Sequence, residues 1–217
     1  MAPPSPGLLI LIRHTESVWN EKGVWTGTRD AQLTSKGFED ARLLGNLIRD
    51  IHIDHAYASM QIRTMETLSS LLGMIQQPTV PITQNEALNE RDYGDYTGTN
   101  KHAMKEMLGE EMFDSIRRGW NVPVPHGETL QKVYDRIVPY YLNDILPRLN
   151  EGENVLVVSH GNALRALTKF IENISDEDIE KREMMSGAAL VYQVANDGRV
   201  KSKELRETTS ASFDTHA

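Results

Sequence analysis

The sequence contains no cysteine, and this absence excludes disulfides, thiolate nucleophiles, zinc ribbons and iron–sulfur clusters together. Redox chemistry is therefore not expected. Long apolar runs are also missing, since no stretch approaches the roughly 18 apolar residues that a membrane helix needs. The N-terminal MAPPSPG has no basic region followed by an apolar segment, as a secretory signal would. We expect a cytoplasmic protein that does not bind membranes.

An excess of positive charge is missing too: 23 Lys and Arg stand against 31 Asp and Glu, a net charge of -8. Nonspecific nucleic-acid binding needs clustered cations that displace the counterions of phosphates, so no nucleic-acid partner is expected. A small anionic ligand is still compatible with this charge, because the potential inside a cleft can be positive on a negatively charged protein.

The 217 residues, 39% hydrophobic and 25% charged, have the composition of an ordinary folded protein. We expect one catalytic domain over residues 8–205, after a flexible leader at 1–7 and before a disordered tail at 206–217.

Apolar periodicity predicts strands that alternate with helices. The expected strands cover 8–12, 55–58, 80–82, 154–158 and 188–194, and the expected helices cover 34–48, 61–75, a region after 101, 128–149 with a kink at Pro139, and 162–171. The loop at 87–101 is long and polar, as functional loops often are. This alternation predicts a three-layer α/β/α fold with a mostly parallel sheet and helices on both faces. Ligands of such sheets bind at the carboxyl ends of the strands.

Two histidines occupy these carboxyl ends. Arg13 and His14 directly follow the strand at 8–12, and Ser159 and His160 follow the strand at 154–158. A lone histidine at a strand end is more often structural, but a pair with arginines nearby favours a site. Neutral imidazole is available near pH 7 and attacks phosphorus without a metal. We therefore expect His14 to accept a phosphoryl group.

Arginine and helix amides supply the rest of the expected phosphate site. Arg13, Arg63 and Arg165 offer planar forks of donors that match phosphate oxygens. Gly161 and Asn162 begin a predicted helix, where free amides favour an anion.

The histidines also allow a metal interpretation. His14-Thr15-Glu16 has the spacing of a zinc-deaminase element, but that motif needs cysteine ligands. His52 and His55 form at most a weak pair without a third ligand. No metal is expected.

The strings LIRHTESVWN, VWTGTRDAQLTSKG, ALNERDYGDYTGTNK, IRRGW, GETL and VVSHGNALRAL occur in this order. They resemble the cofactor-dependent phosphoglycerate mutases of the histidine phosphatase superfamily, from about Leu8 to Leu205. The R-H pair with the late S-H-G is typical of the superfamily, and E-R-x-Y-G, N-K and R-R-G are typical of the mutase branch.

The resemblance implies a role for each matching residue. His14 would be the phosphohistidine, Arg13, Arg63 and His160 would hold the transferring phosphoryl group, and Glu90 would be the general acid and base. The remaining matches would bind the substrate: Ser17, Asn20, Thr26, Gly27, Tyr93, Lys101, Arg117, Arg118 and Asn162, with Gly161 beside them.

The implied activity is the interconversion of 3-phosphoglycerate and 2-phosphoglycerate in glycolysis and gluconeogenesis. The implied cofactor is 2,3-bisphosphoglycerate, as phosphoryl donor and intermediate, and the partner is a small phosphorylated substrate. Thr15, Asp92 and the segment 186–190 depart from the mutase pattern. Two alternatives therefore stay open: a phosphomonoesterase that uses the same His14 and Glu90, and a non-catalytic scaffold that binds phosphorylated ligands. A homo-oligomer is also compatible with the sequence.

Overall fold

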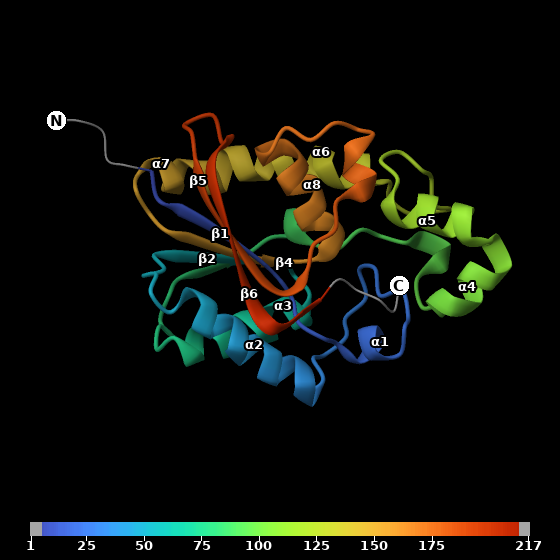
Figure 1. Cartoon of the computed structure of the whole chain (residues 1–217), viewed down its shortest axis with the longest axis horizontal. Coiled ribbons are helices and arrows are strands. Elements are labelled where there is room, and N and C mark those ends of the chain that lie inside the picture. Colours follow the sequence, from blue (N-terminus) through green and yellow to red (C-terminus); the bar gives the residue numbers. More distant parts are fainter. Residues whose placement is uncertain (1–5, 213–217) are drawn as a thin grey trace.

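Six strands form one sheet at the centre of the molecule (Figure 1). The structure is a computed structural model, and it describes residues 6–212. The strand order is β3-β2-β4-β1-β5-β6. Neighbours among β3, β2, β4 and β1 are parallel, whereas β5 runs antiparallel to β1 and β6 antiparallel to β5. The bounds are β1 (Leu8–Arg13), β2 (His55–Ala58), β3 (Ile82–Gln84), β4 (Val155–Ser159), β5 (Ser186–Val194) and β6 (Val200–Ser212).

Helices cover both faces of this sheet, as the sequence predicts (Figure 1). The helices α2 (Ser35–Ile48) and α3 (Ile62–Met74) lie on one face. The other face carries α6 (Leu130–Tyr140), α7 (Leu146–Asn150) and α8 (Gly161–Ile171).

Strand β1 is buried on both faces because its side chains alternate between the two helical layers. Leu9 and Leu11 join the core under α6, α7 and α8, while Ile10 and Ile12 join the core under α2 and α3. This double burial explains why β1 is a continuous apolar run rather than an alternating one.

The helix predicted over 128–149 has the expected interruption next to Pro139. A π-helical turn, η3 (Tyr141–Ile145), separates α6 from α7. Proline lacks an amide donor, so the regular i to i−4 bonding cannot continue there.

The C-terminal prediction was wrong for residues 206–212, which are the second half of β6 and not a disordered tail. Backbone pairing with β5 supplies the order, and the Arg206 guanidinium donates to the Leu47 carbonyl at 2.8 Å and pairs with Asp50. An edge strand exposes much of its surface and therefore carries little apolar periodicity. Residues 1–5 of the expected leader, and residues 213–217, lie outside the described residues.

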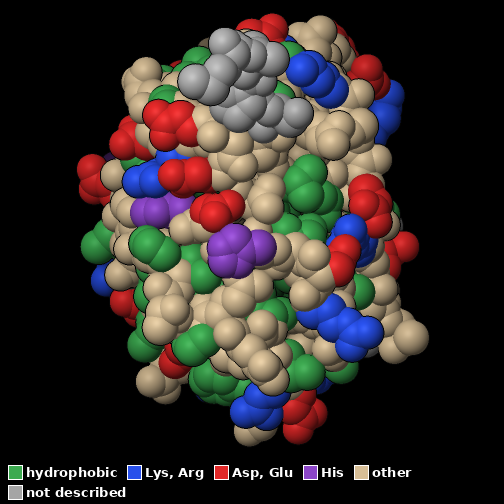
Figure 2. Space-filling view, turned by 90° about the vertical axis from the view of Figure 1, so that its left-hand side faces the viewer, with side chains coloured by type: hydrophobic (Ala, Val, Ile, Leu, Met, Phe, Trp, Pro, Cys, Tyr) green, Lys and Arg blue, Asp and Glu red, His purple; other side chains and the backbone are tan. Residues whose placement is uncertain are grey.

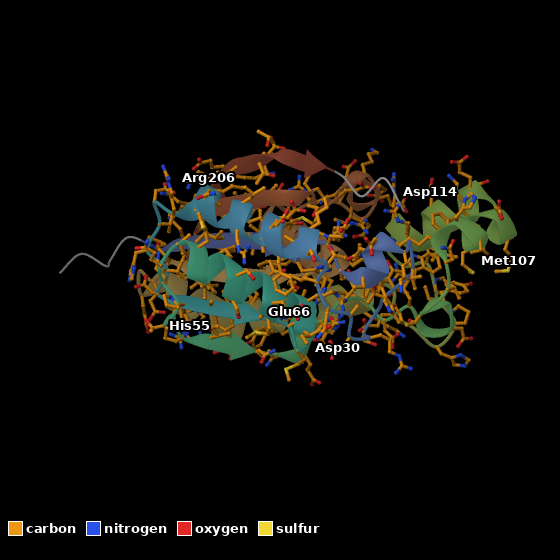
Figure 3. The ribbon with its side chains drawn as sticks, turned by 90° about the horizontal axis from the view of Figure 1, so that it is seen from below. Asp30, His55, Glu66, Met107, Asp114 and Arg206 are labelled. Atoms are coloured by element: carbon orange, nitrogen blue, oxygen red, sulfur yellow. The ribbon has the colours of Figure 1, made fainter. Side chains whose placement is uncertain are left out.

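A small cap stands over the carboxyl ends of the strands (Figure 1). It consists of α4 (Lys101–Leu108) and α5 (Glu110–Arg118), and the short α1 (Val18–Glu21) lies nearby. Figure 3 shows Met107 and Asp114 on this cap, at the far end of the molecule from His55. The cap has its own apolar core, formed by Trp25, Tyr93, Met104, Phe113, Ile116 and Val124.

The opposite end of the molecule faces the viewer in Figure 2, where acidic, basic and apolar side chains are interspersed. Over residues 6–212, none of the helices has the length and apolar character required to cross a bilayer.

Candidate active site

The two strand-end histidines lie side by side because β1 and β4 are neighbours in the sheet. The register pairs Arg13 with Ser159, so His14 and His160 leave the sheet at the same level. Their ring centroids are 4.9 Å apart and the rings meet edge to face. Both side chains are buried, at 4% and 0% exposure.

The contacts of His14 select one tautomer of its ring. Nδ1 lies 2.7 Å from the Thr15 carbonyl oxygen, which can only accept a hydrogen bond. Nε2 accepts from the Arg63 Nε–H at 3.3 Å. Nδ1 therefore carries the proton, and Nε2 keeps the lone pair that a nucleophile needs.

Arg63 holds its charge beside this lone pair although it is only 1% exposed. Its two terminal nitrogens donate to the carbonyls of Arg29 and Gly27 at 2.8 and 3.0 Å. Burial lowers the pKa of Arg63 to about 10, partly offset by the charges of Glu90 and Asp30. The guanidinium is therefore still cationic at neutral pH.

His160 is a neutral base in this environment. Burial, followed by the charges of Arg63, His14 and Arg13, lowers its pKa well below the ordinary 6.5. Its Nε2 lies 2.8 Å from the Ser59 hydroxyl. Its Nδ1 is buried and has no hydrogen-bond partner within residues 6–212. A buried polar nitrogen of this kind is suited to a ligand oxygen.

The Glu90 carboxylate is positioned by backbone amides. Its Oε1 accepts from the amides of Arg91 and Asn162 at 2.8 and 3.2 Å, and its own amide donates to Gln61 at 2.8 Å. Asn162 lies in the first turn of α8, whose amides favour a carboxylate. These contacts orient the carboxylate from both the loop and the helix.

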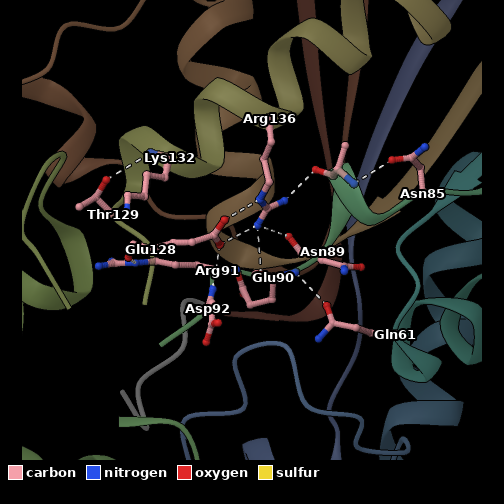
Figure 4. A network of polar contacts seen from close by, with 11 residues as sticks. Gln61, Asn85, Asn89, Glu90, Arg91, Asp92, Glu128, Thr129, Lys132 and Arg136 are labelled. Carbon is pink, nitrogen blue, oxygen red and sulfur yellow. Dashed lines mark hydrogen bonds and ion pairs between the residues drawn. The ribbon is translucent and has the colours of Figure 1, made fainter. Parts of the chain in front are cut away.

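A second network fastens the Glu90 loop to α6 (Figure 4). Arg136 donates to the carbonyls of Ala87, Asn89 and Glu90 at 2.8 to 3.1 Å and forms an ion pair with Glu128. Burial alone would raise the pKa of Glu128, but the hydrogen bond and charge of Arg136 bring it below its ordinary value. The loop is therefore held by a charged pair that stays ionised at neutral pH.

One cleft collects most of the predicted residues. Its empty space, including the open mouth, is about 740 Å³. The predicted residues in its wall are Arg13, His14, Asn20, Thr26, Gly27, Arg63, Glu90, Tyr93, Lys101, Arg117, Arg118, Gly161, Asn162 and Arg165. His160 is fully buried and is not part of this wall, but its ring packs against that of His14. Ser17 is fully buried outside this wall, where its hydroxyl and amide bind Asn20, so it positions Asn20 from behind.

Arg165 also lines the cleft, but it does not have the phosphate-binding role that the sequence predicts, because carbonyls and one amide oxygen use all five of its N–H groups. It donates to the carbonyls of Arg117, Arg118, Ile179 and Arg182 and to the Asn162 amide oxygen, at 2.7 to 3.3 Å. Burial lowers its pKa to about 10. Arg165 therefore links α8 to the end of α5 through hydrogen bonds, and none of its N–H groups remains to bind a phosphate.

A stack of aromatic side chains positions Tyr93 and connects it to the cap. Trp25 stacks between Tyr93 at 5.1 Å and Phe113 at 5.4 Å, both nearly parallel to it. The Tyr93 hydroxyl accepts from the Asn162 amide nitrogen at 2.9 Å. The stack joins the loop after α1, the Glu90 loop and α5.

Two of the three departures from the mutase pattern, Thr15 and Asp92, point away from the cleft. The Thr15 hydroxyl donates to the Gly37 carbonyl at 2.8 Å, on the α2 side. The Asp92 carboxylate accepts from the Gly94 amide at 2.9 Å and closes a turn. Neither side chain lines the cleft, so the additional carboxylate of Asp92 is not part of its wall.

Several supporting residues escape sequence reasoning. Gln61, Arg91 and Arg136 bind backbone groups, which have no sequence pattern of their own, and Ser59 contacts His160 from a segment 101 residues away in the chain. Glu128 lies in the GETL string and could have been found there.

Among the residues from 6 to 212, groups of three or more His, Asp or Glu side chains arranged to hold a metal are absent. The three-layer fold, with paired histidines and arginines at its carboxyl edge, is that of a phosphoryl-transfer enzyme. The chain belongs to the histidine phosphatase superfamily (branch 1), whose family model matches residues 9–208.

Curated relatives are similar over most of the chain. The 2,3-bisphosphoglycerate-dependent phosphoglycerate mutase of Parvibaculum lavamentivorans is 42% identical, over 92% of this chain and 96% of its own. The enzyme of the same name from Rhizobium meliloti is also 42% identical, over 92% of this chain and 95% of its own. Among solved structures, Bacillus stearothermophilus YhfR matches with a TM-score of 0.76 and 28% identity, over 90% of this chain and 98% of its own.

Proposed function

We propose that this protein is a 2,3-bisphosphoglycerate-dependent phosphoglycerate mutase that interconverts 3-phosphoglycerate and 2-phosphoglycerate through a phosphohistidine at His14. The observation that carries the proposal is the His14 ring, whose Nδ1 proton is fixed by the Thr15 carbonyl and whose Nε2 lone pair lies beside Arg63. The mutases of about 40% identity support this substrate class. We infer a single cytoplasmic catalytic domain that works in glycolysis and gluconeogenesis.

The residues at the His14 end suit a transferring phosphoryl group. Attack by Nε2 forms the N–P bond while the bond from phosphorus to the donor oxygen breaks. The ring becomes positive, and the Thr15 carbonyl stabilises it through Nδ1–H. Arg13 and Arg63 would hold the phosphoryl oxygens, with the buried Nδ1 of His160 as a further contact.

Glu90 would move the proton of the reacting hydroxyl. When the phosphohistidine transfers its group to a substrate hydroxyl, the O–P bond forms, the N–P bond breaks and Glu90 accepts the hydroxyl proton. When the other phosphoryl group returns to His14, Glu90 gives that proton back to the oxygen that is released. The two half-reactions balance, and no net proton or phosphate is produced.

The cleft also fits a ligand with anionic groups at both ends. Lys101, Arg117 and Arg118 of the cap would hold the second anionic group and the carboxylate. When bound, 2,3-bisphosphoglycerate supplies the phosphoryl group that primes His14.

The test is an assay of 3-phosphoglycerate isomerisation with and without catalytic 2,3-bisphosphoglycerate, with released phosphate measured in the same samples. We expect isomerisation that depends on the bisphosphate, and a loss of at least about 1,000-fold in His14→Ala. His52→Ala, at an exposed histidine outside the cleft, is the matched control. Phosphate release without isomerisation would make the protein a phosphomonoesterase, and binding without turnover would make it a scaffold.

A further inference from the structure

The cleft wall contains a second carboxylate, Glu183, that the proposed reaction does not use. Glu90 and Glu183 are its two acidic residues over the described part of the chain, while its other charged side chains, His14 aside, are arginines and Lys101. Glu183 lies between η4 (Asp178–Lys181) and β5. A carboxylate in a cleft for polyanions opposes binding unless it has another task.

The position of Glu183 is fixed by the arginines around it. On one side of Glu183, the Arg182 carbonyl accepts from Arg165 at 2.7 Å, and on the other the Met184 carbonyl accepts from Arg13 at 3.3 Å. The backbone that carries the carboxylate is therefore tied to both ends of the cleft. Glu183 is not a mobile surface residue that happens to lie nearby.

The Glu183 side chain is close to Arg118, one of the cap cations. Oε1 lies 2.7 Å from an Arg118 terminal nitrogen, and the side chains are 22% and 42% exposed. The contact is an ion pair without the alignment of a hydrogen bond, and the buried Oε1 receives no hydrogen bond from another donor within residues 6–212. An ion pair that is partly exposed on its arginine side and lacks this alignment contributes little stability, so another anion can replace the carboxylate.

We propose that Glu183 is a specificity-determining residue that competes with the second anionic group of the substrate for Arg118. The inference rests on the proposed function and extends it. An incoming phosphate or carboxylate must displace Glu183 from Arg118 and lie near its negative charge. Glu183 therefore weakens the binding of substrates with two anionic ends and hastens the release of products, while it affects a ligand with one anionic group less.

The test compares two ligands in the variant Glu183→Gln, which keeps the shape of the side chain and removes its charge. The first quantity is the KM for 3-phosphoglycerate in the isomerisation assay. The second is the competitive Ki of inorganic phosphate, which has a single anionic group. We expect the ratio of KM to Ki to fall about tenfold, the size of effect given by one removed repulsion in a partly exposed site.

Two further variants sharpen the test. Glu153→Gln removes the charge from an ion pair of similar exposure with Arg148, outside the cleft wall, and should leave the ratio within about twofold. Arg118→Gln removes the contested cation, so adding Glu183→Gln to it should change the ratio by less than about threefold if competition for Arg118 is the cause.

An unchanged ratio, or a rise in KM like that of Arg118→Gln, would overturn the inference, because Glu183 would then be inert or would orient Arg118 for binding. If Glu183→Gln still lowers the ratio of KM to Ki tenfold in the Arg118→Gln background, Glu183 does not act by competing for Arg118. It would then repel the substrate directly. These outcomes presuppose isomerisation by the unaltered protein, and its absence would refute the proposed function instead.

Discussion

Arg165 offers the sharpest quantitative prediction, because one buried side chain connects the end of α5 with α8. Replacing it with lysine keeps the charge but reduces five N–H donors to three. The five oxygens around Arg165 cannot all be reached by one ammonium group. At least two of these acceptors must then lose their donor. The five acceptors include the carbonyls of Arg117 and Arg118 at the end of α5.

The cost follows from the hydrogen bonds that disappear. Each bond to a charged group contributes about 1.5 to 3 kcal/mol, so losing two should lower the free energy of unfolding by about 3 to 6 kcal/mol before relaxation and about 2 to 4 kcal/mol after it. For a chain of this size, each kcal/mol lowers Tm by about 2 to 4 °C. We therefore expect Arg165→Lys to melt about 5 to 15 °C lower.

A functional effect should accompany this loss of stability. The last carbonyls of α5 have no helical amide partners, and Arg165 fixes the turn from which Arg117 and Arg118 extend. Loosening that turn should raise the KM for 3-phosphoglycerate about tenfold, with a smaller effect on the Ki of inorganic phosphate.

The assay is thermal unfolding together with steady-state kinetics well below the lowered Tm. Arg199→Lys is a suitable control, because that guanidinium binds the Phe170 carbonyl near the C-terminal end of α8, whereas the cleft lies at the N-terminal end of this helix. A large fall in Tm with an unchanged KM would refute the positioning argument. An unchanged Tm would refute the assignment of five used donors.

Three more predictions concern the nucleophile loop, the buried histidine and the Glu90 loop. Thr15→Val removes the hydroxyl that donates to the Gly37 carbonyl, so the free energy of unfolding should fall by about 1 kcal/mol. The kcat should fall as well, because the Thr15 carbonyl that binds His14 Nδ1–H loses its orientation. A variant with wild-type kcat would show that the hydroxyl does not orient this carbonyl. The pKa of His160 is lowered in the folded protein, so below pH 6.5 the unfolded chain binds a proton that the folded chain does not. The free energy of unfolding is therefore not affected by the titration of this group above pH 6.5. It falls as the pH drops below 6.5, by up to about 1.4 kcal/mol per pH unit. Denaturant titrations at pH 5 to 7 should show this slope, reduced in His160→Gln, and an equal slope in both proteins would contradict it. Arg136→Met removes the donors that hold the carbonyls of the Glu90 loop. Steady-state kinetics should show kcat lowered about 100-fold with a smaller change in KM, because Glu90 is no longer positioned. A change in KM alone would contradict this role of Arg136.

Local sequence patterns were sufficient for most of the core elements. The apolar run before Arg13 and the one before Ser159 each predicted a buried strand, and Thr34 predicted the start of α2, whose first turn it caps. These signals are local, because an apolar run and a capping residue are both contained in a few consecutive residues of the chain. Strand β6 was missed for the same reason, since an exposed edge strand is ordered by its partner and has no apolar pattern of its own.

The sequence by itself determined which chemical groups the site contains: two strand-end histidines, the arginines and the Glu90 loop. Only the tertiary structure decided what each group does with its donors. Arg63 and Arg165 are both buried arginines with a pKa lowered to about 10, yet Arg63 lies against His14 while Arg165 is used up by carbonyls. The physical reason is that the acceptors around a guanidinium decide which groups its N–H donors bind, and most of these acceptors are backbone carbonyls far away in the sequence.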